Sequence, residues 1–157
     1  MSDDGELQFV LFEIEGVHYG VEVERVLEII ARPEISRVPS ALDCVEGVIN
    51  LRGNVLPVMD LRMRFRLGGD AAKATHIVIV QLQGALAGIS VDGVSQVVRI
   101  PIASIEPAPP AITGPQVRYI EGIAKLEGTL CVLIDLDRAF RPEELALGAA
   151  GGDLDGR

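Results

Sequence analysis

The sequence predicts an all-β protein with short helices, in which two small five-stranded β-barrels are related by a pseudo-twofold axis. Residues 45–65 read VEGVINLRGNVLPVMDLRMRF, with two short apolar runs separated by Arg52, Gly53 and Asn54, which is typical of a β-hairpin. The same pattern returns 75 positions later, in residues 119–140. A repeat of roughly 60 residues is only marginally stable alone, so we expect the two copies to share an apolar seam, with a groove where they meet.

The first copy is expected to begin with a strand over residues 7–14, LQFVLFEI, which is rich in β-forming residues. Glu15 and Gly16 then turn the chain into a second strand. From Glu24 the apolar residues fall at helical spacing, so we expect a short helix that ends at Pro33. Residues 31–43 contain two prolines and should form an extended connector to the hairpin.

The second copy is expected to begin with a strand near Thr75. Gly84 and Gly88 follow Gly16 and Gly20 at an offset of 68 residues, so the change to the offset of 75 places an insertion in the proline-rich segment 99–118. We expect that segment to be an extended surface loop. The domain should therefore span residues 7–140, with copies at 7–65 and 75–140, a short helix within 136–150, and flexible tails at 1–6 and 148–157.

Composition points to protein partners. The chain has 157 residues and a formal net charge of −9, which argues against binding to nucleic acid or to an anionic membrane surface. No apolar run approaches the roughly 20 residues that cross a bilayer, and the N-terminus is acidic, so we expect a cytoplasmic protein without membrane insertion. Cys44 and Cys131 lack a metal-binding or redox spacing and are expected to be buried, inert thiols.

Motifs for catalysis or cofactor binding are missing from the sequence. It contains neither a phosphate-binding glycine loop nor a GxSxG elbow, and His18 and His76 stand alone. Asp60 and Asp135 occupy matching positions after each hairpin, and this equivalence favours a shared role as helix caps over acid–base catalysis. We therefore predict no catalytic residue, no metal, no cofactor and no enzymatic activity.

The two copies differ most in charge. The first copy carries the dense positive cluster Arg52, Arg62, Arg64 and Arg66, whereas Glu127 and Asp137 stand in the second copy where Arg52 and Arg62 stand in the first. Two interpretations remain open from the residues alone: a solvated hairpin edge whose charges prevent aggregation, or an asymmetric docking surface.

Three stretches resemble the CheW family of chemotaxis coupling proteins. Residues 47–65 resemble that family's NLRG hairpin and the DLR helix start that follows it. The segments 88–100, GISVDGVSQVVRI, and 9–30, FVLFEIEGVHYGVEVERVLEII, resemble its other two signatures. Their order and spacing agree from residue 7 to residue 140.

The resemblance implies a non-catalytic adaptor made of two interlocked five-stranded SH3-like barrels. Such proteins link methyl-accepting chemoreceptors to the histidine kinase CheA in arrays beneath the cytoplasmic membrane. The groove between the barrels would receive the receptor's helical tip, and barrel-end surfaces would pair with the regulatory domain of CheA. The positions that match the family's receptor-binding motif are Val26, Glu28, Gly47 and Arg52, with Glu28 and Arg52 expected to pair; Arg62, Arg64 and Arg66 form a candidate basic docking patch.

Two alternatives accompany this hypothesis. The chain could serve a chemosensory pathway other than chemotaxis, such as a pilus-based or developmental one. It could also be a small-molecule-binding β-barrel with a ligand pocket in the inter-barrel groove. The aromatic content of 4%, with no Trp, disfavours the second alternative.

Overall fold

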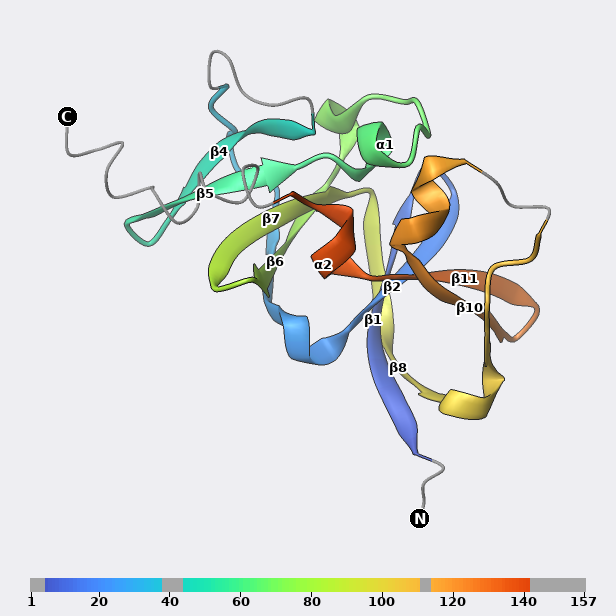
Figure 1. The fold of residues 1–157 in the computed structure, drawn as a ribbon. Helices are drawn as coiled ribbons and strands as arrows, with labels where there is room; N and C mark the ends of the chain where they lie inside the picture. The colour runs from blue at the N-terminus through green and yellow to red at the C-terminus, as the bar shows by residue number, and fades with distance from the viewer. Residues whose placement is uncertain (1–4, 38–43, 111–113, 142–157) are drawn as a thin grey trace.

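The computed structural model describes residues 5–37, 44–110 and 114–141, which form two antiparallel-rich β-sheets packed against each other (Figure 1). Barrel 1 has the strand order β3-β6-β7-β5-β4, and barrel 2 has the order β8-β1-β2-β11-β10 with the two-residue strand β9 added at its edge. The strands are β1 (Glu6–Ile14), β2 (Val17–Glu22), β3 (Val26–Ala31), β4 (Val45–Leu51), β5 (Asn54–Met59), β6 (His76–Leu82), β7 (Ala85–Val91), β8 (Gly93–Pro101), β9 (Ile105–Glu106), β10 (Ile120–Leu126) and β11 (Thr129–Ile134).

The two barrels are built from equivalent strands in equivalent registers. Phe9 pairs with Val98 in barrel 2, and Ile77 pairs with Ile30 in barrel 1, so each partner is replaced by the residue 68 positions away in the other copy. Each barrel also mixes the two copies, because the β1–β2 hairpin of the first copy lies beside β8 and β11 of the second. The predicted internal duplication and interlocking are thus confirmed.

Each sheet closes in the same way. In barrel 2, β8 continues through the 3₁₀ helix η3 (Ile102–Ser104) into β9, which pairs with β10 at the opposite edge. In barrel 1, the segment after β3 reaches β4 through paired hydrogen bonds of 2.9 and 2.8 Å between the backbones of Ser36 and Val48. Both five-stranded sheets therefore curl into SH3-like barrels, as predicted.

Four tight turns define the hairpins. Each has a non-glycine residue at a φ near 50° followed by a glycine at a φ near 80–90°, as in Arg52 (49°) and Gly53 (89°). Two consecutive positive φ values are what a type I′ turn requires, and this turn matches the twist of the flanking strands. The predicted hairpin is confirmed, although Asn54 already belongs to β5. The four turns are Glu15–Gly16, Arg52–Gly53, Gln83–Gly84 and Glu127–Gly128.

Some expectations were wrong. The helix predicted from Glu24 is instead the short 3₁₀ helix η1 (Val23–Arg25) followed by strand β3, whose residues alternate between half-buried and exposed. Segment 99–118 is not simply an extended loop, because its described part contains the end of β8, η3, β9 and the 3₁₀ helix η4 (Pro115–Tyr119). Glu6, placed in the flexible lead-in, begins β1.

Several other expectations fall on residues outside the described ones. They are the remainder of the N-terminal tail (1–4), part of the first connector (38–43), most of the C-terminal helix and the C-terminal tail (142–157).

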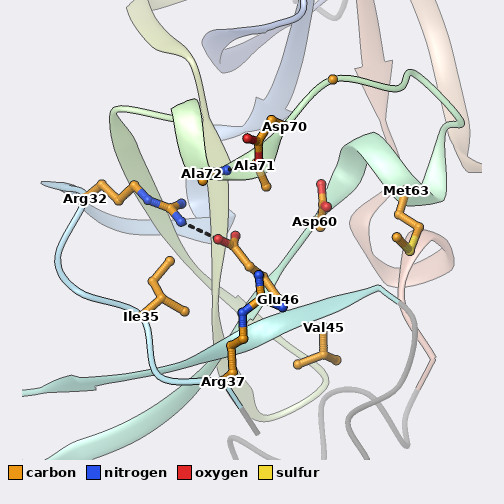
Figure 2. Close-up of a pocket in the computed structure, with 11 residues that line it drawn as sticks. Arg32, Ile35, Arg37, Val45, Glu46, Asp60, Met63, Asp70, Ala71 and Ala72 are labelled. Carbon is orange, nitrogen blue, oxygen red and sulfur yellow. Dashed lines mark hydrogen bonds and ion pairs between the residues drawn. The ribbon is translucent and has the colours of Figure 1, made fainter. Parts of the chain in front are cut away.

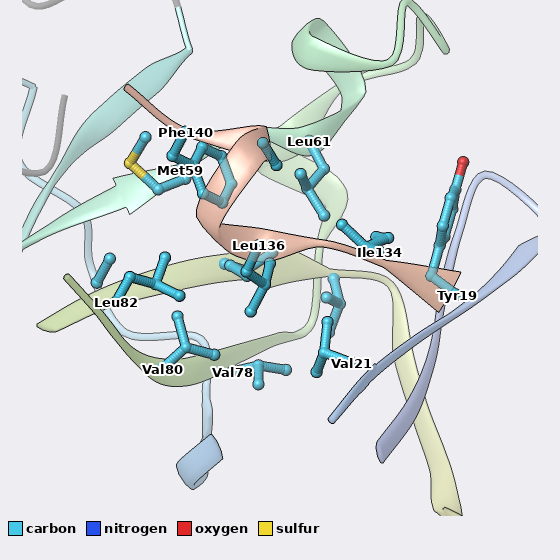
Figure 3. Close-up of a cluster of buried hydrophobic side chains, with 14 of the residues drawn as sticks. Tyr19, Val21, Met59, Leu61, Val78, Val80, Leu82, Ile134, Leu136 and Phe140 are labelled. Atoms are coloured by element: carbon cyan, nitrogen blue, oxygen red, sulfur yellow. The ribbon is translucent and has the colours of Figure 1, made fainter. Parts of the chain in front are cut away.

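The largest apolar cluster lies between the barrels and takes side chains from both (Figure 3). Val21 and Ile134 enter it from barrel 2, and Val78 and Met59 from barrel 1. Two smaller clusters fill the interiors of the individual barrels, one around Phe9 and one around Ile77. The predicted apolar seam is therefore the main core.

Short helices follow the two equivalent hairpins, and each starts at the predicted aspartate. The Asp60 carboxylate accepts a hydrogen bond of 2.9 Å from the backbone N–H of Arg62 at the start of α1 (Leu61–Arg64). Asp135 caps α2 (Leu136–Ala139) by accepting from the backbone N–H of Arg138 at 3.3 Å. In the described part of the chain, no helix combines the length and the apolar character needed to cross a membrane.

Candidate functional site

The sequence-predicted residues Glu28 and Arg52 meet on the surface of barrel 1. Arg52 lies in the β4–β5 turn and donates both terminal guanidinium nitrogens to the carboxylate of Glu28 on β3, with an Nη1–Oε1 distance of 3.4 Å and a shorter second contact. The Arg52 side chain is 68% exposed and that of Glu28 is 32% exposed. The hydrogen bond from Arg52 lowers the pKa of Glu28. The pair is therefore charged at neutral pH and accessible to a partner.

The turn that holds Arg52 is fixed by a local hydrogen bond and by its backbone angles. Asn50 accepts a hydrogen bond of 2.8 Å from the backbone N–H of Gly53 through its side-chain oxygen. With positive φ at Arg52 and Gly53, this contact holds the Arg52 side chain at the tip of the hairpin.

A β-bulge in β3 sets the position of Glu28. Val26 pairs with Val80 of β6, and Glu28 pairs with Ile79, the residue directly before Val80. Two steps along β3 thus correspond to one step along β6, so Leu27 is the extra residue. A bulge of this kind re-aims the side chains around it. Leu27 is 54% exposed and Ile29 is 39% exposed, while Val26 packs against the core between the barrels.

Leu27 and Ile29 thus flank Glu28 as exposed apolar residues, and the sequence interpretation missed them. The expected helix would have buried them, and only the strand assignment places them outward. No signal in the sequence alone distinguishes an exposed leucine from a core leucine here.

Gly47 has a steric role at the closure of barrel 1. A Cβ added there would lie 2.4 Å from the carbonyl oxygen of Ser36 and 2.8 Å from Cγ2 of Ile35. The equivalent Gly122 is crowded in the same way, with Cγ2 of Ile105 at 2.4 Å. Gly47 is buried, so it shapes the barrel and does not offer an exposed side chain to a partner.

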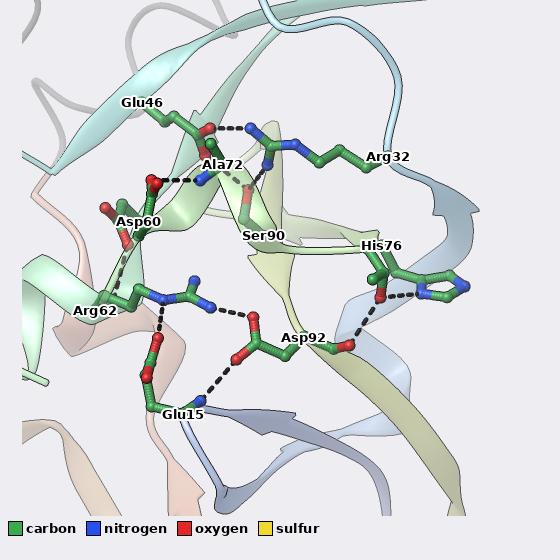
Figure 4. Close-up of polar contacts among 11 residues, drawn as sticks. Glu15, Arg32, Glu46, Asp60, Arg62, Ala72, His76, Ser90 and Asp92 are labelled. Atoms are coloured by element: carbon green, nitrogen blue, oxygen red, sulfur yellow. Dashed lines mark hydrogen bonds and ion pairs between the residues drawn. The ribbon is translucent and has the colours of Figure 1, made fainter. Parts of the chain in front are cut away.

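Arg62 does not belong to an exposed basic patch, which corrects the expectation for this residue (Figure 4). Its side chain is only 3% exposed, and its Nε donates to Glu15 at 2.9 Å while Nη2 contacts Asp92. Burial alone would lower the pKa of Arg62, but the hydrogen bonds to Glu15 and Asp92 raise it. Arg62 is therefore a permanently charged link between the β1–β2 turn, α1 and the end of β7.

The other two arginines of the expected patch, Arg64 and Arg66, differ from each other in burial. Arg64 is half-buried, with its guanidinium carbon 5.8 Å from the ring centroid of Tyr119 and 6.0 Å from that of Phe140. Arg66 is exposed. Arg62, Arg64 and Arg66 therefore do not form one continuous docking patch.

A surface cavity of about 480 Å³ lies beside the barrel 1 closure (Figure 2). Arg32 lines this cavity and donates hydrogen bonds to the Ser90 hydroxyl, at 3.0 Å, and to the Glu46 carboxylate. The Ser90 hydroxyl in turn donates to the Glu46 carboxylate at 2.8 Å. Burial raises the pKa of Asp60 on the same wall. Five of the eleven lining residues are charged. The lining comprises Arg32, Ile35, Arg37, Val45, Glu46, Asp60, Met63, Gly69, Asp70, Ala71 and Ala72.

The region of barrel 2 that corresponds to the Glu28–Arg52 pair is different. Gln96 and Glu127 stand at the equivalent positions and cannot form an ion pair. Both residues line a surface cavity of about 490 Å³. An arginine at this hairpin turn is thus a feature of barrel 1 only, as the charge difference between the copies predicts. Among the described residues, no group of three or more His, Cys, Asp or Glu side chains is placed to hold a metal ion.

Comparison with known proteins identifies the family to which this architecture belongs. Residues 8–144 match the CheW-like domain. The chain is 33% identical to a chemotaxis protein CheW of Klebsiella aerogenes over 141 residues, covering 89% of this chain and 85% of the relative. It is also 33% identical to the chemotaxis protein CheW of Rhizobium meliloti, with 90% and 92% covered.

A solved structure and a further relative extend the comparison. The crystal structure of the scaffolding protein TtCheW from Thermoanaerobacter tengcongensis is similar with a TM-score of 0.78 and 34% identity, covering 88% of this chain and 90% of that one. Protein FrzA of Myxococcus xanthus is 34% identical over 106 residues, which is 66% of each chain.

Proposed function

The chain belongs to the CheW-like domain family, and on this premise we propose that it is a non-catalytic adaptor that couples methyl-accepting chemoreceptors to the histidine kinase CheA. The adaptor binds the cytoplasmic tip of a receptor and the regulatory domain of the kinase at the same time. It works in the cytoplasm, at receptor arrays beneath the membrane.

The observation that carries this proposal is the exposed Glu28–Arg52 pair beside Leu27, the exposed extra residue of the β3 bulge. An apolar strip with a polar rim is the kind of surface that binds one face of an amphipathic helix, and the receptor tip is a helical hairpin. Leu27 supplies an apolar contact, and Arg52 supplies a charge that only barrel 1 has at this position. Val26 and Gly47 support the site from beneath, through the core and the barrel closure.

The kinase contact uses other surfaces of the barrels. The regulatory domain of CheA is related to this family, so barrel-to-barrel pairing between the two proteins is the expected mode. We assign no individual residue to that contact.

The pathway has a second candidate. Similarity to FrzA of Myxococcus xanthus supports a role in a chemosensory pathway other than chemotaxis, with the same adaptor mechanism. The small-molecule alternative has less support, because five of the eleven residues that line the cavity in Figure 2 are charged, whereas ligand pockets are mostly apolar.

A pull-down tests the proposal. The purified chain is mixed at micromolar concentration with the cytoplasmic fragment of a receptor and with the CheA kinase of the same organism. We expect the chain to retain each of them alone and both together. Failure to retain either partner would contradict the adaptor function.

A further inference from the structure

A cavity of about 490 Å³ opens on barrel 2 at the place where barrel 1 carries the Glu28–Arg52 pair. Gln96 and Glu127, which stand at the positions of that pair in the other copy, both line this hollow, the barrel 2 cavity. Because the two barrels have equivalent strands in equivalent registers, the lining of the cavity can be compared with barrel 1 position by position.

Two differences between the copies account for the hollow. In barrel 1, Leu56 and Leu86 pack in the apolar cluster inside the barrel. Cys131 and His18 stand at the equivalent positions of barrel 2, where they line the cavity and are partners in the parallel pairing of β11 with β2. Cysteine is smaller than leucine, and histidine brings a polar ring. The cavity is therefore open where two leucines pack in barrel 1.

The floor of the barrel 2 cavity is apolar. Leu11 is 4% exposed and Cys131 is 1% exposed, and Val98 and Leu126 pack against the same barrel 2 cluster. Burial raises the pKa of the Cys131 thiol, so this group stays protonated at neutral pH and is part of the apolar floor, not a nucleophile. A floor of this kind suits the hydrocarbon part of a small ligand.

Two cations line the barrel 2 cavity from different strands. Arg99 extends from β8 and Lys125 from β10, at positions where barrel 1 has the neutral residues Ala31 and Asn50. In the part of the chain that the structure describes, no ion pair or side-chain hydrogen bond neutralises either cation. Both cations are therefore available to an anion that enters the cavity.

The sign of the cavity opposes that of the whole chain. The other titratable groups of the lining are His18, counted as neutral, Glu127 and the protonated Cys131, so two cations and one anion leave a charge of +1 in a chain of net charge −9. Arg99, Lys125 and Glu127 are exposed, so solvent screens their charges and the apolar floor must add to the binding of an anion. A single positive charge matches a monoanion better than a doubly charged phosphate ester.

We propose that the barrel 2 cavity binds a small organic carboxylate, with the apolar part of the molecule on the floor and its carboxylate on Arg99 and Lys125. A volume of about 490 Å³ lies within the range of ligand pockets, which combine apolar walls with a few polar groups. Ser95, Gln96 and Thr129 supply such groups at this cavity. The site lies on the barrel opposite to the Glu28–Arg52 pair, so a bound carboxylate leaves the proposed receptor surface free.

NMR titration of the nitrogen-15-labelled chain with phenylacetate tests the proposal, with phenylacetamide as the uncharged analogue. We expect phenylacetate to shift the backbone amide signals of Arg99, Lys125 and Cys131 in a saturable way, with a dissociation constant of about 1 mM for so small a ligand. Phenylacetamide should bind about tenfold more weakly, because it lacks the charge. Absence of saturable shifts at these residues, or equal binding of the two compounds, would overturn the proposal.

Variants separate the charge from the cavity. Arg99→Gln should raise the dissociation constant of phenylacetate about tenfold through loss of a charge-assisted hydrogen bond, whereas Arg66→Gln, a matched change of an exposed arginine outside the lining, should leave it unchanged. The double variant His18→Leu with Cys131→Leu introduces the barrel 1 residues and should abolish the shifts, while its melting curve reports whether it is folded. Full binding by Arg99→Gln or by the folded double variant, or an equal loss in Arg66→Gln, would contradict the assignment.

Discussion

Gly47 lies where barrel 1 closes, and its missing side chain leaves space for the backbone of Ser36. The contact is steric alone, because no positive φ is recorded at Gly47. Family resemblance groups Gly47 with the receptor-binding residues, but its position implies that substitutions act first on the fold. Loss of binding in a Gly47 variant must therefore be compared with its stability.

We predict that Gly47→Ala lowers the free energy of unfolding by about 1–3 kcal/mol, because the added methyl group overpacks the closure. Urea denaturation followed by circular dichroism measures this change. Gly93→Ala is the matched control, since a Cβ at Gly93 meets nothing within 4 Å. Equal losses in the two variants would contradict the steric account.

At the scale of the element, the β4–β5 hairpin needs a glycine for a different reason than the barrel closure does. Gly53 is required for its backbone conformation, whereas Gly47 is required because a side chain would not fit there. Gly53 has a φ of 89°, and a Cβ there would meet nothing within 4 Å. The cost of a side chain at Gly53 is therefore set by the left-handed conformation, which asparagine tolerates better than β-branched residues do.

We accordingly expect Gly53→Val to cost about 1–2 kcal/mol of stability and Gly53→Asn to cost distinctly less. Urea denaturation of the two variants tests the difference. The two substitutions should be similarly harmful at Gly47, where space decides the outcome. If valine and asparagine proved equivalent at Gly53, the turn would not require a positive φ.

Strand β3 was predicted as a helix, and its residue pattern explains the error. Its apolar residues Val26, Leu27, Ile29 and Ile30 lie on both faces, so the alternation that marks a strand is hidden and a helical spacing fits by coincidence. The hairpins and helix caps were predictable, because turn glycines and capping aspartates act through neighbouring residues. The bulge at Leu27, which exposes an apolar side chain beside Glu28, depends on pairing with the distant β6.

At the scale of the whole molecule, the sequence repeat predicted two barrels but could not determine which copy completes which barrel. Both copies carry the same apolar pattern, so a hairpin can satisfy its hydrogen bonds within its own copy or with the other. The exchange follows only from tertiary contacts, such as the parallel pairing of β2 with β11. The burial of Arg62 could not be predicted for the same reason, because its partners Glu15 and Asp92 lie 47 and 30 residues away in the chain.

The barrels are joined at two equivalent places by contacts from the short helices. The helix residue is a cation in α1 (Arg62) and an anion in α2 (Asp137). In one, Arg62 on α1 contacts Glu15 in the β1–β2 turn of barrel 2. In the other, Asp137 on α2 contacts Arg25, and its backbone carbonyl accepts a hydrogen bond of 3.3 Å from Gln83 in the β6–β7 turn of barrel 1. Each helix thus ties its own barrel to a hairpin turn of the other.

We predict that Arg62→Met destabilises the chain by about 2 kcal/mol, because it leaves Glu15 and Asp92 close together without a cation; the partial exposure of both carboxylates keeps the loss below that of a fully buried pair. Urea denaturation at neutral pH measures the loss. Arg66→Met, at an exposed position, should change stability by less than about 0.5 kcal/mol.

The most direct test of the adaptor account measures how Arg52→Glu affects the two partners separately. The substitution places two carboxylates together on an exposed surface, so we expect receptor-fragment affinity to fall about tenfold or more while affinity for CheA and the unfolding free energy stay nearly unchanged. Combining it with Glu28→Arg restores the ion pair and serves as the matched control for charge placement. Titration calorimetry with each partner supplies the numbers. Undiminished receptor binding by a folded Arg52→Glu variant, or equal loss of both partners, would contradict the assignment of this surface to the receptor.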